Sequence, residues 1–302
     1  MSTTHVVIMA GGIGSRLFPL STPEKPKQFL DLLSCGKSLI RLTYERFLAV
    51  DPKAVFWVVT SANYIPYVRE MLPEIPSEQV LAEPMARNTA PCISYACRKI
   101  GLRYPNARIV VTPSDAYVPD YKAFAETVRL ALSFVEERER IVCLGIHPTF
   151  PSSDYGYIKE LPGDLASSGK RFEEGGEVIR KVDSFKEKPS TDVAQEYLDE
   201  GGYWWNAGIF IWSAKTIETQ LRRYVPGIEQ QMDTLQPALY SPEEQRVLEM
   251  VFPQCEKISI DYALMEKSPD IFLAPCRWEW SDLGSFEALE IVRAQRQKSP
   301  LK

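Results

Sequence analysis

The chain has 302 residues, 45% of them hydrophobic, which is enough for one large α/β domain or two small ones with a sizeable core. Its 35 Lys and Arg against 40 Asp and Glu give a formal net charge of −5, which argues against non-specific binding to nucleic acids or anionic membranes. The sequence has neither a bilayer-spanning apolar run nor a signal-peptide pattern, so we expect a cytoplasmic protein.

The chain opens with a short apolar run at residues 6–10, followed by a glycine-rich stretch at residues 11–14. The run predicts a buried strand, and the glycines allow the main chain to turn and to approach a ligand closely. Arg16, Lys25 and Lys27 supply cations that would suit a polyphosphate. The stretch matches neither a Walker loop nor the dinucleotide fingerprint. It therefore indicates a phosphate-binding loop of another kind, with an ordinary Gly-rich turn as the alternative.

Strands and helices then alternate along the first half of the chain. Apolar runs predict strands at residues 54–59, 79–81, 108–111 and 141–146, and helical periodicity predicts helices at residues 38–50, 64–72, 90–104 and 121–137. Continuous apolar runs are typical of strands that are covered on both faces, as in a parallel sheet. The alternation predicts a doubly wound sheet that binds ligands at the carboxyl ends of its strands.

The second half is less regular. Residues 161–176 are polar and aperiodic, and we interpret them as an exposed, mobile hairpin excursion. Further strands are predicted at residues 155–158, 178–186, 203–212, 258–260 and 271–273, and helices at residues 241–250, which open with a capping box, and 286–297. We find no internal repeat and no Pro/Gly linker, so residues 1–302 are expected to form a single domain.

Two aspartates stand at junctions between a predicted strand and the segment that follows. Asp115 comes shortly after the strand at residues 108–111, and Asp282 precedes the last helix. The alternatives are a turn residue for Asp115 and a helix N-cap for Asp282. As a pair, two carboxylates would suit Mg²⁺, which proteins bind through one or two carboxylates plus substrate phosphates. Only two histidines are present and the six cysteines form no Cys-x-x-Cys pair, so histidine catalysis, zinc and disulfides are not expected.

Two further polar segments are ambiguous when they are considered alone. Residues 83–91 form a polar loop in which Asn88 or Thr89 would cap the following helix. Residues 185–189, Phe-Lys-Glu-Lys-Pro, end a predicted strand, and such a charge run is most often a solvated surface segment.

Together these motifs resemble the sugar nucleotidyltransferases, and among them the mannose-1-phosphate guanylyltransferases. The resemblance rests on Gly-Gly-x-Gly-Ser-Arg-Leu-x-Pro-Leu at residues 11–20, Pro-Lys-Gln at residues 26–28 and Glu-Pro-x-x-Arg-Asn-Thr-Ala-Pro at residues 83–91. It implies a Rossmann-like, doubly wound mixed sheet of the nucleotide-diphospho-sugar transferase type, with a β-rich sugar-binding portion. Residues 1–150 would mainly bind the nucleotide and residues 151–302 the sugar phosphate.

For the nucleotide, the resemblance implies contacts from the glycine loop, the loop at residues 83–91 and the end of the strand before Asp115. The implied residues are Ala10, Gly11, Gly12, Gly14, Ser15, Arg16, Glu83, Arg87, Asn88, Thr89, Ser114 and Asp115. Glu83 would accept hydrogen bonds from the N1–H and 2-amino groups of guanine, a donor pair that other bases lack. We expect Arg16 and Lys27 to face the triphosphate from the side opposite Asp115 and Asp282, and Lys25 to lie in solvent.

For the sugar phosphate, the resemblance implies that Lys188 contacts the phosphate and Glu187 the sugar hydroxyls. The implied sugar-binding residues are Gly156, Tyr157, Glu187, Lys188, Asn206, Gly208 and Asp261. The implied catalytic residues are Arg16, Lys27, Asp115 and Lys188, and the implied Mg²⁺ ligands are Asp115 and Asp282.

The implied reaction is Mg²⁺-dependent transfer of GMP from GTP to mannose 1-phosphate, giving GDP-mannose and pyrophosphate by direct displacement. One alternative is a nucleotidyltransferase for another hexose 1-phosphate or nucleotide, and a second is a non-catalytic nucleotide-sugar sensor on the same fold. Neither nucleic acid nor membrane is an expected partner, whereas a homodimer is compatible with the resemblance. The C-terminal β-helix or cupin-like domain of some relatives is not represented, so we expect a catalytic core.

Overall fold

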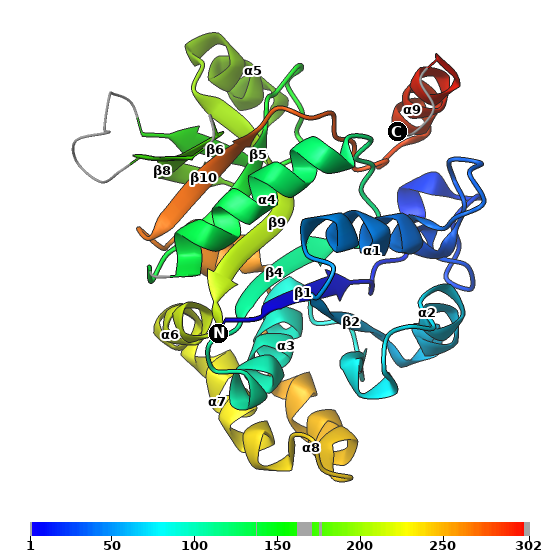
Figure 1. Ribbon diagram of the computed structural model, residues 1–302, viewed down its shortest axis with the longest axis vertical. Helices are drawn as coiled ribbons and strands as arrows, with labels where there is room; N and C mark the ends of the chain where they lie inside the picture. Colours follow the sequence, from blue (N-terminus) through cyan, green and yellow to red (C-terminus); the bar gives the residue numbers. More distant parts are fainter. Residues whose placement is uncertain (1, 137, 162–170, 175–176, 299–302) are drawn as a thin grey trace.

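The computed structural model describes residues 2–136, 138–161, 171–174 and 177–298, and it is built around one ten-stranded sheet with helices on both faces (Figure 1). The strands are β1 (Thr4–Met9), β2 (Val55–Ser61), β3 (Val80–Glu83), β4 (Arg108–Pro113), β5 (Ile141–Ile146), β6 (Tyr157–Glu160), β7 (Arg171–Glu174), β8 (Glu177–Lys186), β9 (Tyr203–Ser213) and β10 (Ile271–Cys276). The helices are α1 (Leu39–Val50), α2 (Ile65–Met71), α3 (Thr89–Arg103), α4 (Tyr121–Glu136), α5 (Thr191–Glu200), α6 (Ala214–Tyr224), α7 (Pro226–Leu235), α8 (Glu244–Val251) and α9 (Phe286–Lys298).

The sheet is mixed, with the strand order β3-β2-β1-β4-β9-β5-β10-β8-β6 and β7 paired with β8. The strands β3, β2, β1 and β4 run parallel to one another, and β5 runs parallel to β10. Between these two parallel groups lies β9, which is antiparallel to both β4 and β5. The predicted doubly wound mixed sheet is therefore confirmed.

The sheet is covered on both faces, as its continuous apolar strands predict. In β1, Val6 and Ile8 belong to one buried cluster while Val7 belongs to another, because successive side chains in a strand point to opposite faces. The first cluster includes residues of α1, α2 and α4, and the second includes residues of α3, α6, α7 and α8 (Figure 1). Each face thus has its own hydrophobic layer.

A third, smaller cluster fixes the N-terminal loop against the C-terminal helix. Leu17 of the 3₁₀ turn η1 (Ser15–Leu17) is buried together with Tyr117, Leu283 and Leu289. These residues come from three separate parts of the chain, at residue 17, at residue 117 and at residues 283–289. Their packing holds the segments that carry Arg16, Asp115 and Asp282 next to one another.

The structure also differs from several local predictions. Sequence reasoning missed α5, α6 and α7, although Ser213 caps α6 and Ile217 and Leu221 mark its buried face at helical spacing. Residues 258–260 do not form a strand: the Ile258 carbonyl accepts a hydrogen bond from Ala90 N, and the chain then enters the π-helical turn η8 (Asp261–Met265). Of the predicted hairpin excursion at residues 161–176, only 161 and 171–174 lie within the described residues, and Arg171–Glu174 is the strand β7.

The predicted capping box before α8 is formed differently from the expectation. The helix begins at Glu244, and the Glu244 carboxylate accepts a hydrogen bond from Tyr240 N at 2.7 Å and ion-pairs with Lys99 at 2.6 Å. The expected partner was the main chain of Ser241, whose hydroxyl instead accepts from Glu243 N at 3.2 Å. The Glu244 carboxylate therefore binds the main chain one residue before Ser241 and, in addition, Lys99 of α3.

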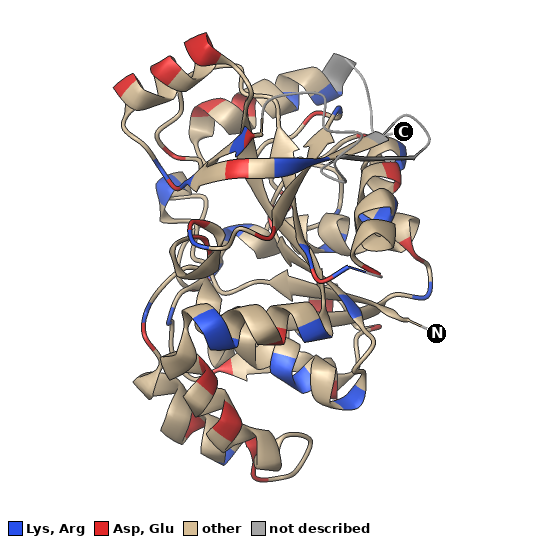
Figure 2. Cartoon of the chain, turned by 90° about the vertical axis from the view of Figure 1, so that its left-hand side faces the viewer, with Lys and Arg blue, Asp and Glu red and all other residues tan. Residues whose placement is uncertain are grey.

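Charged residues of both signs are interspersed on the side of the molecule drawn in Figure 2, in keeping with the small net charge. Within the part of the chain that the structure describes, every helix is too short or too polar to cross a membrane. The six cysteines are all free thiols; Cys35 is half-buried and the other five are buried, which is usual for cysteines that pack as small core residues.

Candidate active site

Predicted site residues from both halves of the chain meet at one edge of the sheet. The glycine loop begins directly after Met9, the last residue of β1, and β4 ends at Pro113, just before Ser114 and Asp115. Because β1 and β4 are parallel, both segments lie at the same edge. Gly208 of β9 lies beside them, since a Cβ atom on it would be 3.7 Å from Pro113 Cγ. The nucleotide-side and sugar-side predictions therefore converge.

The glycine loop is held from the protein interior. Gln28 is buried, and its amide donates to the carbonyl oxygens of Ala10 (3.0 Å) and Gly12 (2.9 Å). The buried Thr60 hydroxyl also donates to the Ala10 carbonyl, at 2.8 Å. Residues 11–13 are exposed. The carbonyl groups of the loop are thus bound on the inner side, which leaves its outer side available for a ligand.

Lys27 lies between the two segments that carry the predicted metal ligands. Its side chain is only 6% exposed, and Nζ contacts Asp115 Oδ2 at 2.8 Å and donates to the main-chain carbonyl of Asp282. A buried ammonium group needs such partners, because desolvation would otherwise disfavour its charge. The expectation that Lys27 faces a ligand from the side opposite these aspartates is therefore wrong, since Lys27 is in direct contact with both residues.

Arg16 is more accessible, with 57% of its side chain exposed, and it bridges two carboxylates. Nη1 donates to Asp154 Oδ2 at 3.0 Å, and Nη2 lies 3.5 Å from Asp282 Oδ2. Arg16 therefore also lies on the same side as Asp282, contrary to the expectation. An exposed ion pair of this kind contributes little free energy, so the guanidinium can exchange partners readily.

Asp282 is held in a defined orientation. An antiparallel bridge joins Tyr117 to Ser281 and places Asp282 beside the segment that follows β4. The Asp282 Oδ1 atom accepts hydrogen bonds from the Tyr155 hydroxyl and from Gly284 N, both at 3.0 Å. The remaining carboxylate oxygen, Oδ2, is the one nearest to Arg16.

The helix-cap alternative does not account for Asp282. The helix α9 is capped by Ser285, whose hydroxyl accepts from Ala288 N at 3.1 Å, and not by Asp282. The start of α4 is stabilised by Asp120, which accepts from Ala123 N at 2.9 Å. Asp115 and Asp282 instead point toward Lys27 and Arg16, which favours a functional role for both.

Glu83, at the end of β3, is a buried carboxyl group in the part of the site predicted to bind the nucleotide base. Burial raises its pKa to about 8, and Oε1 lacks a hydrogen-bond partner among the described residues. A Cβ atom on Gly11 would lie 3.3 Å from Glu83 Oε2, so the carboxyl group is directly beside the glycine loop. A buried polar atom without a partner is rare in folded proteins and suggests that a ligand normally supplies one.

The side chains of the three residues predicted to shape the base and ribose site hydrogen-bond to main-chain groups of the protein. Arg87 donates to the Pro253 carbonyl, and the Thr89 hydroxyl accepts from Ile260 N at 2.8 Å. Asn88, with φ +66°, caps α3 by accepting from Thr89 N. These contacts fasten the loop to residues 253–260, so an effect of these side chains on a nucleotide would be largely indirect.

On the sugar side, a bulge in β9 places an asparagine beside two carboxyl groups. Asn206 accepts from Gly208 N at 2.9 Å and donates to Asp261 Oδ1 at 3.0 Å. Glu187 is 10% exposed, and Lys188 Nζ lies 3.4 Å from its Oε1. Burial raises the pKa of Asp261, and burial together with the nearby Asp261 charge raises that of Glu187. The cluster offers both hydrogen-bond acceptors and a mobile cation, a mixture that suits a phosphorylated sugar.

Gly156 and Tyr157 have different positions. A Cβ atom on Gly156 would lie 3.3 Å from Asn206 Cβ and would collide with the Glu187 carboxylate, so Gly156 belongs to the sugar-side cluster. The Tyr157 side chain is 1% exposed, packs against Tyr197, and accepts a hydrogen bond from Ser152 N. The prediction that Tyr157 contacts the sugar is therefore wrong for its side chain, because the ring is buried in the core.

The carboxylates at Asp115 and Asp282 fit Mg²⁺ only if a substrate completes the coordination. Across the described parts of the chain, no group of three or more His, Cys, Asp or Glu side chains is arranged to hold a metal ion. Two carboxylates flanking a phosphate-binding loop match the preference of Mg²⁺ for few protein oxygens plus substrate phosphates. The residues present are thus compatible with a metal that arrives with the nucleotide.

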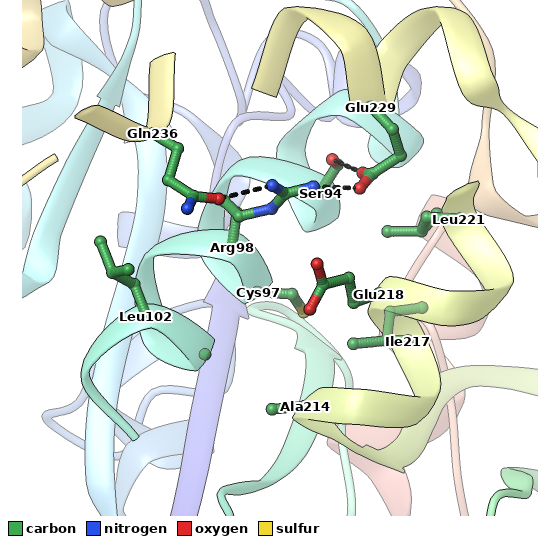
Figure 3. A pocket seen from close by; sticks show the side chains of 11 residues that line it. Ser94, Cys97, Arg98, Leu102, Ala214, Ile217, Glu218, Leu221, Glu229 and Gln236 are labelled. Carbon is green, nitrogen blue, oxygen red and sulfur yellow. Dashed lines mark hydrogen bonds and ion pairs between the residues drawn. The ribbon is translucent and has the colours of Figure 1, made fainter. Parts of the chain in front are cut away.

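Two cavities are lined by polar and charged side chains. One, of about 940 Å³, lies next to Arg16 and Asp282 and is lined by Tyr155, Trp205 and Trp280 among others. The other, of about 230 Å³, lies between α3, α6 and α7. In this smaller cavity Arg98 and Ser94 both bind Glu229 (Figure 3). Because these polar groups satisfy one another, we regard the smaller cavity as part of the helix packing.

Sequence reasoning missed Gln28, Asp154 and Tyr155 as members of the site. Gln28 was part of a recognised motif, but only its position under the loop reveals its function. Asp154 and Tyr155 directly precede Gly156, so a polar and aromatic pair next to a predicted sugar-binding glycine was the available signal. Their partners are 138 and 127 positions away in the chain, a separation that local patterns do not encode.

Comparison with known proteins agrees with this arrangement of a phosphate-type loop, paired carboxylates and a mixed α/β sheet. Residues 5–299 match the model of the nucleotidyl transferase family. The chain therefore belongs to the nucleotidyl transferase family, and the resemblance deduced from its motifs is confirmed at that level.

Within this family, the following relatives and solved structure are similar to the chain. The mannose-1-phosphate guanylyltransferase of Escherichia coli (strain K12) is 34% identical over 301 residues, which cover 97% of this chain and 60% of the relative. The alginate biosynthesis protein AlgA of Pseudomonas aeruginosa is 34% identical over 96% of this chain and 58% of its own length. The chain thus spans about three fifths of these curated relatives. A crystal structure described as a mannose-1-phosphate geranyltransferase from Thermus thermophilus matches with a TM-score of 0.82 and 32% identity over 96% of this chain and 79% of that one.

Proposed function

We propose that the protein transfers GMP from GTP to mannose 1-phosphate, giving GDP-mannose and pyrophosphate. The observation that carries the proposal is the position of Lys27, which lies beside the glycine loop and contacts both Asp115 and the main chain of Asp282. Two carboxylates and two cations at a phosphate-type loop are the groups that a nucleoside triphosphate with a divalent cation requires. The name of one curated relative with 34% identity, the mannose-1-phosphate guanylyltransferase of Escherichia coli (strain K12), supplies the particular substrates.

The triphosphate would be bound by the glycine loop, with Arg16 and Lys27 against its oxygens. Asp115 and Asp282 would hold Mg²⁺, which when bound lowers the charge on the triphosphate and so assists departure of pyrophosphate. Before the substrate binds, Arg16 and Lys27 are paired with these same aspartates. Binding would therefore draw the exposed Arg16 from a carboxylate to phosphate oxygens, while the buried Lys27 stays paired with Asp115.

The acceptor would be oriented by the sugar-side cluster. Lys188 would contact the phosphate of mannose 1-phosphate, and Glu187 and Asp261 would accept hydrogen bonds from sugar hydroxyls. A phosphate oxygen then attacks the α-phosphorus of GTP, forming one P–O bond as the bond to pyrophosphate breaks. The attacking oxygen is already anionic, so positioning and charge stabilisation suffice, and the chain needs no general base.

Guanine would be recognised by Glu83. Two observations support a carboxylate that accepts from the N1–H and 2-amino groups of the base: Oε1 has no hydrogen-bond partner among the described residues, and Oε2 lies beside Gly11. Adenine and the pyrimidines lack that donor pair. They would leave the buried carboxyl group without a partner, which costs about 1–3 kcal/mol.

A direct assay tests the proposal. The purified protein is incubated with Mg²⁺, each of the four nucleoside triphosphates and each of several hexose 1-phosphates, and pyrophosphate release is measured together with the nucleotide sugar formed. We expect GTP with mannose 1-phosphate to give the highest kcat/KM. Another preferred pair would support the alternative of a different substrate. Binding of GDP-mannose without turnover for any pair would support the sensor.

The setting of the reaction is part of the proposal. Six free thiols suit a reducing compartment, so we place the enzyme in the cytoplasm. We further propose that residues 1–150 supply most nucleotide contacts and residues 151–302 most sugar-phosphate contacts. A homodimer stays a prediction from the resemblance.

A further inference from the structure

The short segment between β5 and β6 contacts both charged groups that flank the proposed triphosphate site. Within it, Asp154 accepts from Arg16 at 3.0 Å, and the Tyr155 hydroxyl donates to Asp282 Oδ1 at 3.0 Å. The segment is itself anchored, because the Ser152 hydroxyl accepts from Asp154 N at 3.2 Å and Ser152 N donates to the buried Tyr157 hydroxyl. One segment thus connects a core side chain to the site.

Tyr155 has little freedom to place its hydroxyl elsewhere. Its ring packs edge-on against Trp205, with ring centroids 5.0 Å apart, and against Trp280 at 5.3 Å. Trp280 lies two residues before Asp282 in the same segment, so Tyr155 holds this segment both through the ring and through the hydroxyl.

We propose that Tyr155 is a positioning residue that fixes the Asp282 carboxylate so that Oδ2 faces the metal-bearing triphosphate. This inference rests on the proposed function. Oδ1 is occupied by two donors, Tyr155 and the main chain of Gly284, whereas among the described residues Oδ2 has only the exposed Arg16, at 3.5 Å. Once a triphosphate draws Arg16 away, Oδ2 is free while the carboxylate keeps its orientation.

The steric surroundings strengthen the assignment of Oδ2. A Cβ atom on Gly284 would collide with Asp282 Oδ2 and lie 3.0 Å from Arg16 Nη2. The carboxylate therefore lies closely over the main chain of Gly284 and has few alternative rotamers as long as Tyr155 holds Oδ1. Without the tyrosine hydroxyl, the side chain would be free to rotate toward the adjacent cavity of about 940 Å³. Groups that orient a metal ligand in this way typically account for about 10- to 100-fold in metal affinity or activity.

The test replaces Tyr155 by Phe, which keeps the ring and removes only the hydroxyl. The probe is GDP-mannose with increasing Mg²⁺, and the readout is the rise in melting temperature of the protein. In the unsubstituted protein we expect GDP-mannose alone to raise the melting temperature and Mg²⁺ to add a further increment. In Tyr155→Phe the rise in melting temperature with GDP-mannose alone should persist. The Mg²⁺ concentration that gives half of the further rise should be about 10- to 100-fold higher than in the unsubstituted protein. Turnover should show the same shift in Mg²⁺ dependence, with kcat largely recovered at high Mg²⁺.

A double-substitution cycle shows whether Tyr155 acts through Asp282. Asp282→Asn should remove the Mg²⁺ increment by itself, and adding Tyr155→Phe should then have no further effect, because both changes act on one ligand. Tyr240→Phe is the matched control: its hydroxyl donates to the Lys99 carbonyl at 2.7 Å, away from the site. This control should leave the Mg²⁺ dependence unchanged.

The outcomes separate the two proposals. If the unsubstituted protein shows neither a shift with GDP-mannose nor turnover, the proposed function is wrong. If it shows both and Tyr155→Phe has the same Mg²⁺ dependence, the positioning role alone is overturned. Loss of the Mg²⁺-independent rise in Tyr155→Phe would also overturn it, because the hydroxyl would then support nucleotide binding in general.

Discussion

Lys27 and Arg16 each contact an aspartate that we assign to the metal, so the ligand-free site holds its cations and anions as mutual partners. The two pairs differ in accessibility. Lys27 is 6% exposed and pairs at 2.8 Å, whereas Arg16 is 57% exposed and lies 3.5 Å from Asp282. The buried pair should hold the architecture, and the exposed pair should respond to the ligand. Substitutions at the two aspartates ought therefore to have different consequences.

We expect Asp282→Asn to abolish most activity and to leave the fold intact. The Asn Oδ1 atom can still accept from Tyr155 and Gly284 N, while the charge near Arg16 is lost. Turnover should fall by about 10²- to 10³-fold, the usual effect of removing one group that stabilises transition-state charge. Steady-state kinetics and thermal melting measure the two effects, with Asp120→Asn, which affects only the start of α4, as the control.

Asp115→Asn should reduce activity to a similar extent and, in addition, destabilise the protein. It removes the ion-pair partner of the buried Lys27, and an unpaired buried charge costs about 3–5 kcal/mol. Equal melting temperatures for Asp115→Asn and Asp282→Asn would contradict this distinction between a buried and an exposed pair. Full turnover by both variants would show that neither carboxylate serves the metal.

Glu83 should make nucleotide binding dependent on pH. Its pKa is raised to about 8 by burial, and guanine needs the ionised form, so binding must release a proton at neutral pH. The affinity for GDP-mannose should rise about tenfold per pH unit from about pH 6 and level off above the pKa of Glu83. Calorimetry in buffers of different ionisation enthalpy measures the released proton, and Glu83→Gln should bind more weakly with a flat pH profile. A sloping profile in Glu83→Gln would place the titrating group elsewhere.

The same group gives an independent stability readout. The folded pKa of Glu83 lies above its ordinary value of 4.5, so the protonated group is the one that the fold favours. Stability present at low pH is therefore lost as the pH rises through the folded pKa. Glu83→Gln removes this loss, so the variant should melt above the unsubstituted protein near pH 8 and lose the difference near pH 5. A pH-independent difference would contradict the raised pKa.

At the scale of elements, the turn from the glycine loop into η1 requires glycine at position 14, because the main chain there has a positive φ. Gly14 has φ +72°, and a Cβ atom there would lie 2.6 Å from Lys27 Cβ. Gly12, two residues earlier, has open space around its Cβ position. The two glycines therefore separate a structural requirement from a requirement for close approach to a ligand.

Gly14→Ala should lower the free energy of unfolding by about 1–3 kcal/mol, because it adds backbone strain and displaces Lys27. Gly12→Ala should leave stability within about 0.5 kcal/mol and weaken nucleotide binding, because the added methyl group stands between the loop and the phosphates. Chemical denaturation and calorimetric titration with GTP measure the two effects. Unchanged GTP affinity in Gly12→Ala would move the phosphate site away from this loop.

Elements with strong local periodicity were predictable from the sequence. The alternating strands and helices up to β5 follow from apolar runs and helical spacing, within about two residues at each boundary. Three helices between β8 and α8 were missed, α5 among them because Ala194 is its only buried residue. The strand predicted at residues 258–260 failed because its main-chain groups bind the first two residues of α3, Thr89 and Ala90. Local patterns therefore specified elements that bury a whole face.

The residues of the candidate site could be predicted from the sequence, whereas the contacts between them could not. Asp115, Asp282, Lys27 and Arg16 were each identified, yet their mutual pairing was not, because Arg16 and Asp282 are 266 positions apart. Such pairing depends on the order of strands in the sheet. The position of β9 between β4 and β5 has no counterpart in periodicity, since the same apolar pattern suits either strand direction.

At the scale of the whole molecule, β9 joins the two groups of parallel strands into one sheet. Ile211 is fully buried and lies in register with Val110 of β4 and Val142 of β5. Its side chain therefore packs where the nucleotide-side and sugar-side strands meet. Damage at this position should weaken the entire sheet together, although the chain is longer than most domains that unfold in one step.

We expect Ile211→Ala to lower the free energy of unfolding by about 2–5 kcal/mol and to shift one single transition. In the unsubstituted protein, far-UV circular dichroism and tryptophan fluorescence should give one common midpoint. In Ile211→Ala the two probes should again agree with each other, at a lower midpoint. Ile291→Ala, at a side chain that is 53% exposed, is the control and should change stability by no more than about 0.5 kcal/mol. Two separated transitions would mean that the halves unfold independently.

The location of β9 also has a consequence for the order in which the chain is made. Strands β4 and β5 leave the ribosome long before Tyr203–Ser213. Until that segment arrives, β4 lacks one of its two neighbours and β5 lacks both, because β10 is made later still. For this interval both carry open edges with unpaired main-chain groups, the feature that makes β-proteins prone to pair with the wrong chain. A nascent chain that stalls shortly before residue 203 should therefore depend on chaperones more than one that stalls after residue 213.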